Sequence, residues 1–561
     1  MDDERYPPYN KVMADKFRDK KIDLSALSRQ DLERKYILLM TEYESSQAQI
    51  EWYKEQYRLS LQKRYGTSSE KNIVGQMSLS DLPLFNEAEV LRDPINIEPA
   101  ISEEPETDAT SNASKKKSRK KNTKHLPHVT INYTLSEEEK ICPKCNGALH
   151  EMKKEVLRQI EVIPASVRVV EHVSDVYACR TCEELGDASI VKAPGAPVPI
   201  IPKSVAGSSL IADFITKKYQ DAIPFYRIEK NNERAGIPVT RNNMCNWSIK
   251  VADMYFAPIV DRMRQVMFSD GVIHCDETFV EVLAEPDRPA QRKSYIWVTT
   301  TAESQKEHPI ALYNYREGRS AYDARAVLDG FEGYIMCDGY AAYDALLKPR
   351  KDGSPPMNVT LVACMIHIRR KFVEALQVVP VNARGDTGCE MAIEMIATIT
   401  HADSKLKDVP PKERYEKRLF IIKPMMEEFF DWAESELALA LPRSKYGQAL
   451  EYACNLRKKA MHAFLDGRLE FNNNHAERAV KPFVIGRKNW LFADSPSGAD
   501  ASCILYSIVE TAKRNHLIPF EYIKYVLDEI PKERQATQQE IEHLLPWSPT
   551  LPDYVKNPGS V

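Results

Sequence analysis

The amino-acid sequence predicts a multidomain α/β protein. Its 561 residues exceed what one hydrophobic core usually organises, and at about 150 residues per domain roughly three or four units are expected. From about residue 263 onward, strand-like apolar runs alternate with helix-like segments, a pattern typical of a sheet covered by helices. Two Cys-x-x-C pairs upstream of this region indicate a separate small module.

Composition limits the classes of partner and compartment. The 77 basic and 81 acidic residues give a net charge of −4, so any surface that binds a polyanion must be local. No apolar run reaches the roughly 18 residues of a membrane span, and the amino terminus lacks a signal-peptide pattern. We therefore expect a cytoplasmic protein. Four of the 11 cysteines form close pairs, which favours a reducing compartment and a bound metal over disulfides.

Residues 1–75 are predicted to be a helical region with a zipper. From Leu32 to Ser60, apolar, tyrosine and serine residues recur with the three-four spacing of a coiled coil. This predicts a homo-oligomer of modest strength, because tyrosines and serines occupy the seam. The alternative is one amphipathic helix packed on its own domain. Residues 76–125 lose this periodicity, pass from an acidic block to the basic tract 114–124, and are predicted to be a disordered linker.

Residues 126–195 are predicted to form a zinc ribbon. The ligands would be two Cys-x-x-C pairs, Cys142 with Cys145 and Cys179 with Cys182. Two such pairs at this separation suit one tetrahedral Zn²⁺, with an alternating segment at 167–176 expected to supply a strand between them. Four thiolates fill every position of the metal, so the site is expected to be structural. The alternative is four unligated thiols.

Residues 203–262 are predicted to be helical, with breaks at Pro224 and at 236–238. Thr240 is a plausible cap for the helix that follows, and Arg241 stands at the start of that helix. Helix, glycine turn and helix resemble a helix-turn-helix that binds DNA. A plain helical hairpin fits the same pattern.

Residues 263–493 carry the segments of a catalytic core. Strands are predicted at 272–283, 295–301 and 309–315, then a helix at 321–328, a strand ending at Asp338, and a further strand before a basic helix start at 367–371. The order strand, strand, strand, helix, strand, helix, strand is that of a ribonuclease-H-like core. A helical insertion is expected at about 385–465. Residues 494–561 are predicted to be a helical domain whose apolar end docks back on the core.

Three acidic residues form the candidate metal site. Asp276 and Asp338 lie where predicted strands end, and Glu477 lies in a short polar helix, 472–481, expected to end before Pro482. Such carboxylates suit two Mg²⁺ ions in an in-line displacement at phosphorus. Taken singly, each aspartate could be a turn residue and the polar helix a solvated surface. A buried strand accepts Asp276 and Glu277 only where a charge compensates them.

With these segments assembled, the chain resembles the insertion sequence 66 family of transposases, in particular its large subunit. The resemblance is carried by RYGTSSEK, the paired CPKC and CRTC, KYQDAIPFYRIEK, HCDET, CDGYAAYD, CMIHIRRKF, NNNHAERAVKPFVIGRKNWLF, SIVETAKRN and LLPW. It implies a ribonuclease-H-like fold and a triad of Asp276, Asp338 and Glu477 that holds Mg²⁺ or Mn²⁺. It also implies DNA cleavage at element ends, strand transfer to target DNA, and small accessory proteins encoded by the same element.

Basic residues near these motifs are expected to contact DNA phosphates. They are Arg241, Arg369, Arg370, Lys371, Arg478, Lys481, Arg487 and Lys488. Two other functions stay open at this point. One is a metal-dependent nuclease without strand transfer, and the other is a non-catalytic DNA-binding repressor or domesticated transposase.

Overall fold

The computed structural model describes most of the chain from residue 167 onward. The described ranges are 167–178, 190–192, 197–289, 291–349, 353, 355–379, 384–385, 387–441, 443–532 and 535–557, with Tyr36, Met40, Tyr43, Ile50, Tyr53, Lys54 and Tyr57 near the amino terminus. The chain divides into a unit of Val74–Leu361 with Asn473–Val561, here the sheet unit, and a unit of Met1–Ile73 with Val362–Asn472, here the helical unit. Within the described ranges, no helix has the length and apolar character to cross a membrane.

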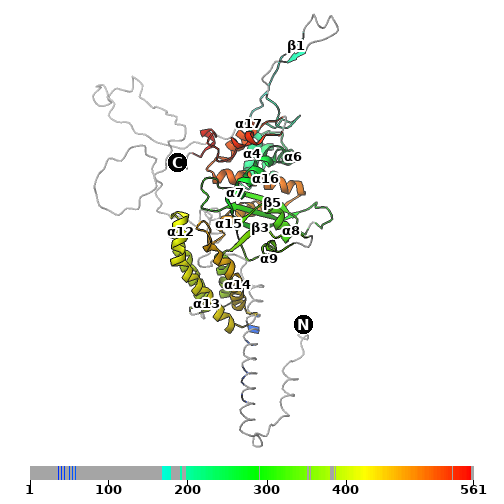
Figure 1. Ribbon diagram of the computed structural model, residues 1–561. Coiled ribbons are helices and arrows are strands. Elements are labelled where there is room, and N and C mark those ends of the chain that lie inside the picture. Colours follow the sequence, from blue (N-terminus) through cyan, green and yellow to red (C-terminus); the bar gives the residue numbers. More distant parts are fainter. Residues whose placement is uncertain are drawn as a thin grey trace, which may run out of the picture. The chain divides into compact units, whose positions relative to one another are not determined.

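A mixed six-stranded sheet forms the centre of the sheet unit (Figure 1). Its strands are β3 (Val272–Val282), β4 (Lys293–Thr301), β5 (Ala311–Arg316), β6 (Gly333–Cys337), β7 (Val359–Ala363) and β8 (Phe492–Ala493). The strand order is β5-β4-β3-β6-β7, and β8 pairs with β3. β4 runs antiparallel to β3 and β5, whereas β6 and β8 run parallel to β3.

The predicted order of elements is confirmed. After β5 the chain forms α8 (Ala321–Val327), β6, α9 (Ala341–Asp344), β7 and α10 (Met365–Val378). β3 is central because its apolar residues from Val272 to Cys275 are buried, while its polar middle, from Asp276 to Thr278, is only partly covered. At Asp276 the strand therefore passes from a buried stretch to a partly exposed carboxylate.

The carboxyl-terminal helices cover the outer edge of the sheet. In α16 (Pro496–Arg514), Ser507 Oγ accepts a hydrogen bond from Tyr313 N at 2.9 Å, and Thr511 Oγ1 accepts one from Ala311 N at 3.1 Å. These bonds satisfy β5 amides that would otherwise form an exposed edge. The apolar end of the chain docks back as predicted, since Leu544 is buried in the same core.

Helix α15 (Asn474–Trp490) corrects one prediction. A helix ending before Pro482 was expected, but α15 continues through this proline for two further turns. A proline inside a helix costs about 3 kcal/mol. Burial of an apolar stripe, Ala476, Ala479, Phe483 and Gly486, at helical spacing offsets that cost. Tertiary packing, which local sequence rules do not include, therefore decided the length of this helix.

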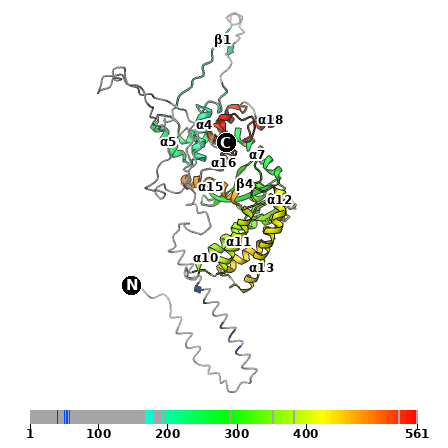
Figure 2. The same cartoon turned by 90° about the vertical axis from the view of Figure 1, so that its left-hand side faces the viewer.

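Three helices lie between residues 203 and 251, and they end and begin where glycine and proline predicted. They are α4 (Ser208–Tyr219), α5 (Phe225–Arg234) and α6 (Arg241–Val251), which Figure 2 shows in part beside α16. Thr240 caps α6 as expected, because its Oγ1 accepts from Asn243 N and the Asn243 side chain accepts from Thr240 N. A π-helical turn, Ala252–Phe256, joins α6 to α7 (Ala257–Asp270).

The predicted strand at 167–176 is largely wrong. Residues 167–175 form no strand, and β1 covers Val176–Ala178, paired antiparallel with β2 (Ile190–Lys192). A segment with alternating residues forms a strand only where a neighbouring strand pairs with it. Within the described residues, β2 pairs with only three residues of β1. The connection from β1 to β2 contains Cys179 and Cys182, which lie outside the described residues.

The described part of the helical unit contains four long helices, of which the last three lie within 385–465, where a helical insertion was predicted. They are α10, α11 (Gly388–Ser404), α13 (Lys423–Leu439) and α14 (Lys445–Met461), with the short α12 (Pro411–Lys417) before a π-helical turn at Arg418–Ile422 (Figure 2). Arg418 is buried, and its guanidinium binds Asp403 in two places, at 2.6 and 2.9 Å. Its remaining donors meet backbone carbonyls of Gly467 and Leu469, which fixes the segment after α14.

Candidate functional site

Asp276 lies on β3 where the strand passes out of the buried core. Its Oδ1 accepts a hydrogen bond from Glu277 N at 2.9 Å. The pKa of the Asp276 carboxyl lies well above its usual range, first because burial disfavours the charged form and then because Glu277, Glu477 and Asp338 add like charges. The other two acids predicted from the sequence, Glu477 and Asp338, thus both act on Asp276 within the sheet unit.

Glu477 lies in the first turn of α15, and Asn473 fixes that turn to β3. Asn473 is fully buried; its Nδ2 donates to Cys275 O at 2.7 Å, and its Oδ1 lies 3.1 Å from His274 Nδ1. Because Nδ2 is the donor group of this amide, Oδ1 accepts and His274 Nδ1 carries the hydrogen. Burial lowers the pKa of His274 to about 4, so this ring is neutral at pH 7. Asn473 therefore sets the distance between the Glu477 helix and the Asp276 strand.

Asp338 is the residue directly after β6, and β6 is the strand next to β3. Its Oδ1 accepts a hydrogen bond from Tyr340 N at 2.9 Å, which orients the carboxylate at the strand end. Its Oδ2 lies 3.7 Å from Arg319 Nη2, and about a quarter of the side chain is exposed. Because β6 runs parallel to β3 with Met336 paired to His274, Asp338 lies beside Asp276, where β6 ends and β3 continues.

Sequence reasoning anticipated a compensating charge beside Asp276 and Glu277 but did not identify it. The structure supplies Arg319, whose guanidinium pairs with Glu277, and Tyr343, whose hydroxyl donates to Glu277 Oε2 at 2.9 Å. Arg319 lies 42 residues from Glu277 in the chain. No local spacing rule links residues so far apart, so only the fold reveals this contact.

The chemistry of the donor set fits a hard divalent cation. Asp276, Asp338 and Glu477 offer oxygen ligands only, which Mg²⁺ and Mn²⁺ prefer. A bound cation would reduce the repulsion between carboxylates that raises the pKa of Asp276. Asp276, Asp338 and Glu477 are each partly exposed, so a cation can reach them from solvent.

The basic residues predicted to contact DNA are distributed over several elements. Arg478 and Lys488 are exposed on α15, and Lys481 is partly exposed. Arg487 donates to Thr278 Oγ1 at 3.1 Å and stacks 3.8 Å from the Phe279 ring, so in this structure it bridges α15 and β3. Its phosphate contact stays a prediction.

The other predicted DNA contacts lie on α6 and α10. Arg241 is exposed at the start of α6, with its backbone N donating to Glu229 Oε1 at 2.8 Å. Arg369, Arg370 and Lys371 lie on α10 in the helical unit, where Lys371 pairs with Glu374 at 3.4 Å. Their roles stay predictions. The zinc ligands Cys142, Cys145, Cys179 and Cys182 lie outside the described residues.

Four family models match the chain. The model described as "Transposase IS66 family" matches residues 203–501, a range that contains Asp276, Asp338 and Glu477. The "zinc-finger binding domain of transposase IS66" matches residues 139–183, which contain the four paired cysteines. The "IS66 C-terminal element" matches residues 507–547, and "Transposase C of IS166 homeodomain" matches residues 52–131.

Three proteins of Sinorhizobium fredii are similar over most of their length. The uncharacterized protein y4jD is 28% identical over 433 residues, which is 76% of this chain and 81% of the relative. The uncharacterized protein y4qI is 28% identical over 70% of each chain. The uncharacterized protein y4hP is 25% identical over 72% of this chain and 73% of the relative. No solved structure matches the chain.

Proposed function

Because the chain belongs to the IS66 family of transposases, we propose that it cleaves the ends of an insertion sequence and joins them to target DNA. DNA is its partner as a member of this family, and its matches include a zinc-finger domain. The finer assignment is that Asp276, Asp338 and Glu477 hold divalent metal ions for this reaction. One observation carries it: Asp338, directly after β6, lies beside Asp276 on β3, and Asn473, four residues before Glu477, bonds to Cys275 O next to Asp276.

The order of the sheet supports a ribonuclease-H-like core. Three consecutive antiparallel strands, β3, β4 and β5, are followed by β6, parallel to β3, and by β7 beyond it. In such a sheet, acids on the first strand and at the end of the next parallel strand lie side by side. A helix that packs on the first strand adds the third acid, and α15 contacts β3 in this way.

The proposed chemistry is an in-line displacement at phosphorus. Mg²⁺ or Mn²⁺, when bound, would activate the attacking oxygen and stabilise the leaving oxygen. Asp276, Asp338 and Glu477 would hold the cations, and Asn473 would keep the Glu477 helix in register with β3. The exposed Arg478 and Lys488 would neutralise phosphates of the bound strand, as would Lys481, Arg487, Arg241, Arg369, Arg370 and Lys371.

We propose that Cys142, Cys145, Cys179 and Cys182 bind a structural Zn²⁺. The zinc-finger model spans all four residues, and the pairing of β1 with β2 brackets the second cysteine pair. A Cys₄ site leaves no open position on the metal, so its role would be to fold the module.

Self-association through the amino-terminal helix is the proposed oligomeric contact. Tyr36, Tyr43, Ile50 and Tyr57 are helical, exposed and spaced by seven residues, which places them on one stripe of a coiled coil. A second copy of the chain would cover this stripe. Small proteins encoded by the same element are proposed as further partners.

The test uses the full chain with labelled DNA that carries the terminal sequences of its own element. We expect Mg²⁺-dependent cleavage by the unsubstituted protein and none by Asp276→Asn or Glu477→Gln, with binding of the ends preserved in both. Cleavage at the normal rate by either variant would refute the assignment of the acids. End binding without cleavage in the unsubstituted protein would instead favour a DNA-binding repressor.

A further inference from the structure

Arg319 lies in the loop between β5 and α8, and its guanidinium faces two carboxylates. Its Nε donates to Glu277 Oε1 at 2.5 Å, and its Nη2 pairs with the same oxygen. Nη2 also lies 3.7 Å from Asp338 Oδ2. The Arg319 guanidinium therefore contacts both Glu277, which follows Asp276 on β3, and Asp338, which follows β6.

The backbone on both sides of Arg319 is held in place. Trp297 Nε1, from β4, donates to Gly318 O at 3.2 Å. Tyr340 donates its hydroxyl hydrogen to Arg319 O at 2.7 Å, and its ring lies 3.7 Å from the guanidinium carbon. The Ser320 side chain begins α8 with a capping box. These contacts fix the guanidinium before any metal or DNA binds.

Glu277 cannot bind a metal ion while Arg319 and Tyr343 occupy its two carboxylate oxygens. Its side chain is 1% exposed, with Oε1 on Arg319 and Oε2 on Tyr343. The Glu277 carboxylate shares the Arg319 guanidinium with Asp338, so it lies close enough to the site to compete for a cation. A buried carboxylate without a partner is costly, and without Arg319 this one would turn toward any nearby cation.

We propose that Arg319 is a positioning residue that withholds Glu277 from the metal site and steers the Asp338 carboxylate toward Asp276. The inference rests on the proposed function, because it assigns Arg319 a role relative to those metal ligands. The four acids, Asp276, Glu277, Asp338 and Glu477, would otherwise compete for the same ions. By pairing with Glu277, Arg319 leaves Asp276, Asp338 and Glu477 as the three metal ligands, in one geometry.

This role predicts opposite effects on metal affinity and on turnover. Arg319→Gln makes the cluster one charge more negative, so it should bind Mn²⁺ at least as tightly as the unsubstituted protein. Cleavage should still fall by about 10- to 100-fold, the usual effect of losing a residue that orients metal ligands. Adding Glu277→Gln removes the competing carboxylate and should restore most of the lost cleavage.

The experiment titrates the full-length protein with MnCl₂ in a calorimeter and measures cleavage of labelled element ends in Mn²⁺. Asp276→Asn identifies the part of the isotherm that belongs to the triad. Arg325→Gln is the matched control, because Arg325 lies on the adjacent α8 and donates to the carbonyls of Pro355 and Leu346. Thermal melting of each variant verifies that it is folded.

We expect Arg319→Gln to lower cleavage without weakening Mn²⁺ binding. Arg325→Gln should change neither cleavage nor Mn²⁺ binding. Mn²⁺ binding that weakens in step with cleavage would overturn the proposal, since general disruption produces that pattern. Unchanged cleavage in Arg319→Gln, or no recovery in the double variant, would also overturn it. An Asp276→Asn isotherm identical to that of the unsubstituted protein would instead refute the metal site itself.

Discussion

Replacing Asn473 by alanine tests how α15 is attached to β3. The change removes the donor to Cys275 O at 2.7 Å and the acceptor of His274 Nδ1 at 3.1 Å, and both partners are buried. Each buried polar group left without its partner costs about 1–3 kcal/mol. The free energy of unfolding should therefore fall by about 2–6 kcal/mol, a large share of the 5–15 kcal/mol that stabilises a typical domain.

Urea denaturation of the full chain, followed by tryptophan fluorescence, measures this loss. Asn489→Ala is the matched control, because Asn489 is exposed on the same helix and donates one hydrogen bond, to Ala222 O at 3.0 Å. Its substitution should cost less than about 1 kcal/mol. Equal losses in the two variants, or a loss under about 1 kcal/mol for Asn473→Ala, would refute the reasoning.

Three further predictions concern a buried lysine, a glycine and a pair of exposed basic residues. Lys218→Met should raise the free energy of unfolding at pH 7 by about 1–3 kcal/mol, because burial lowers the pKa of this ammonium from 10.5 to about 8. Between pH 8 and 10.5, Lys218 is protonated in the unfolded chain but not in the folded protein, so the free energy of unfolding of the unsubstituted protein rises with pH. The advantage of Lys218→Met should shrink over this range. A constant advantage in urea titrations would contradict the prediction.

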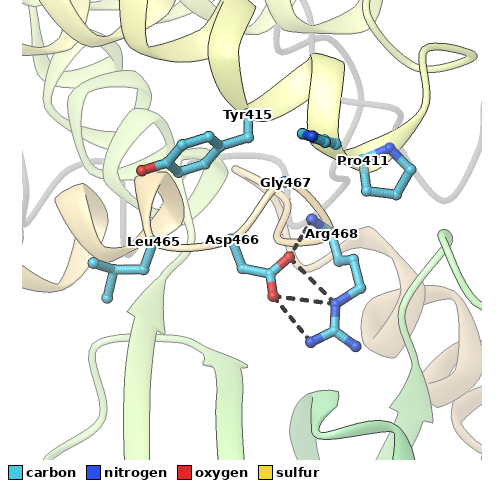
Figure 3. A pocket seen from close by; sticks show the side chains of 7 residues that line it. Pro411, Tyr415, Leu465, Asp466, Gly467 and Arg468 are labelled. Carbon is cyan, nitrogen blue, oxygen red and sulfur yellow. Dashed lines mark hydrogen bonds and ion pairs between the residues drawn. The ribbon is translucent and has the colours of Figure 1, made fainter.

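Gly467→Ala should destabilise the helical unit by about 3 kcal/mol, since its new Cβ would overlap a backbone carbonyl of α12 beside the cleft in Figure 3. Gly207→Ala, with open space around it at the N-cap of α4, should cost less than about 1 kcal/mol. Removing the charges of Arg478 and Lys488 together should lower the slope of log affinity against log salt by about 2; an unchanged slope would exclude both as phosphate contacts.

The order of the central elements could be predicted from sequence because each strand of this sheet has a local signature. Apolar runs end at polar residues such as Asp276 and Asp338, and glycine or proline separates the helices around Pro224. Thr240 could be assigned as a cap for the same reason, since capping depends on neighbours within four residues.

What sequence did not predict depends on contacts between distant segments. The continuation of α15 through Pro482 follows from packing of Phe483 and its neighbours against the core. The pairing of Arg319 with Glu277 links two elements that share no periodicity. Asn473 lies within the polar helix predicted at 472–481, but its bond to the β3 backbone required the fold.

The most direct test of the central claim is a joining assay with labelled element ends and a target plasmid, in the presence of Mg²⁺. The unsubstituted protein should yield products in which a 3′ end is covalently joined to the target. Asp338→Asn, which binds the same ends, should yield none. Joined products at the normal level from Asp338→Asn would contradict the assignment of Asp338, and cleaved but never joined ends from the unsubstituted protein would contradict strand transfer.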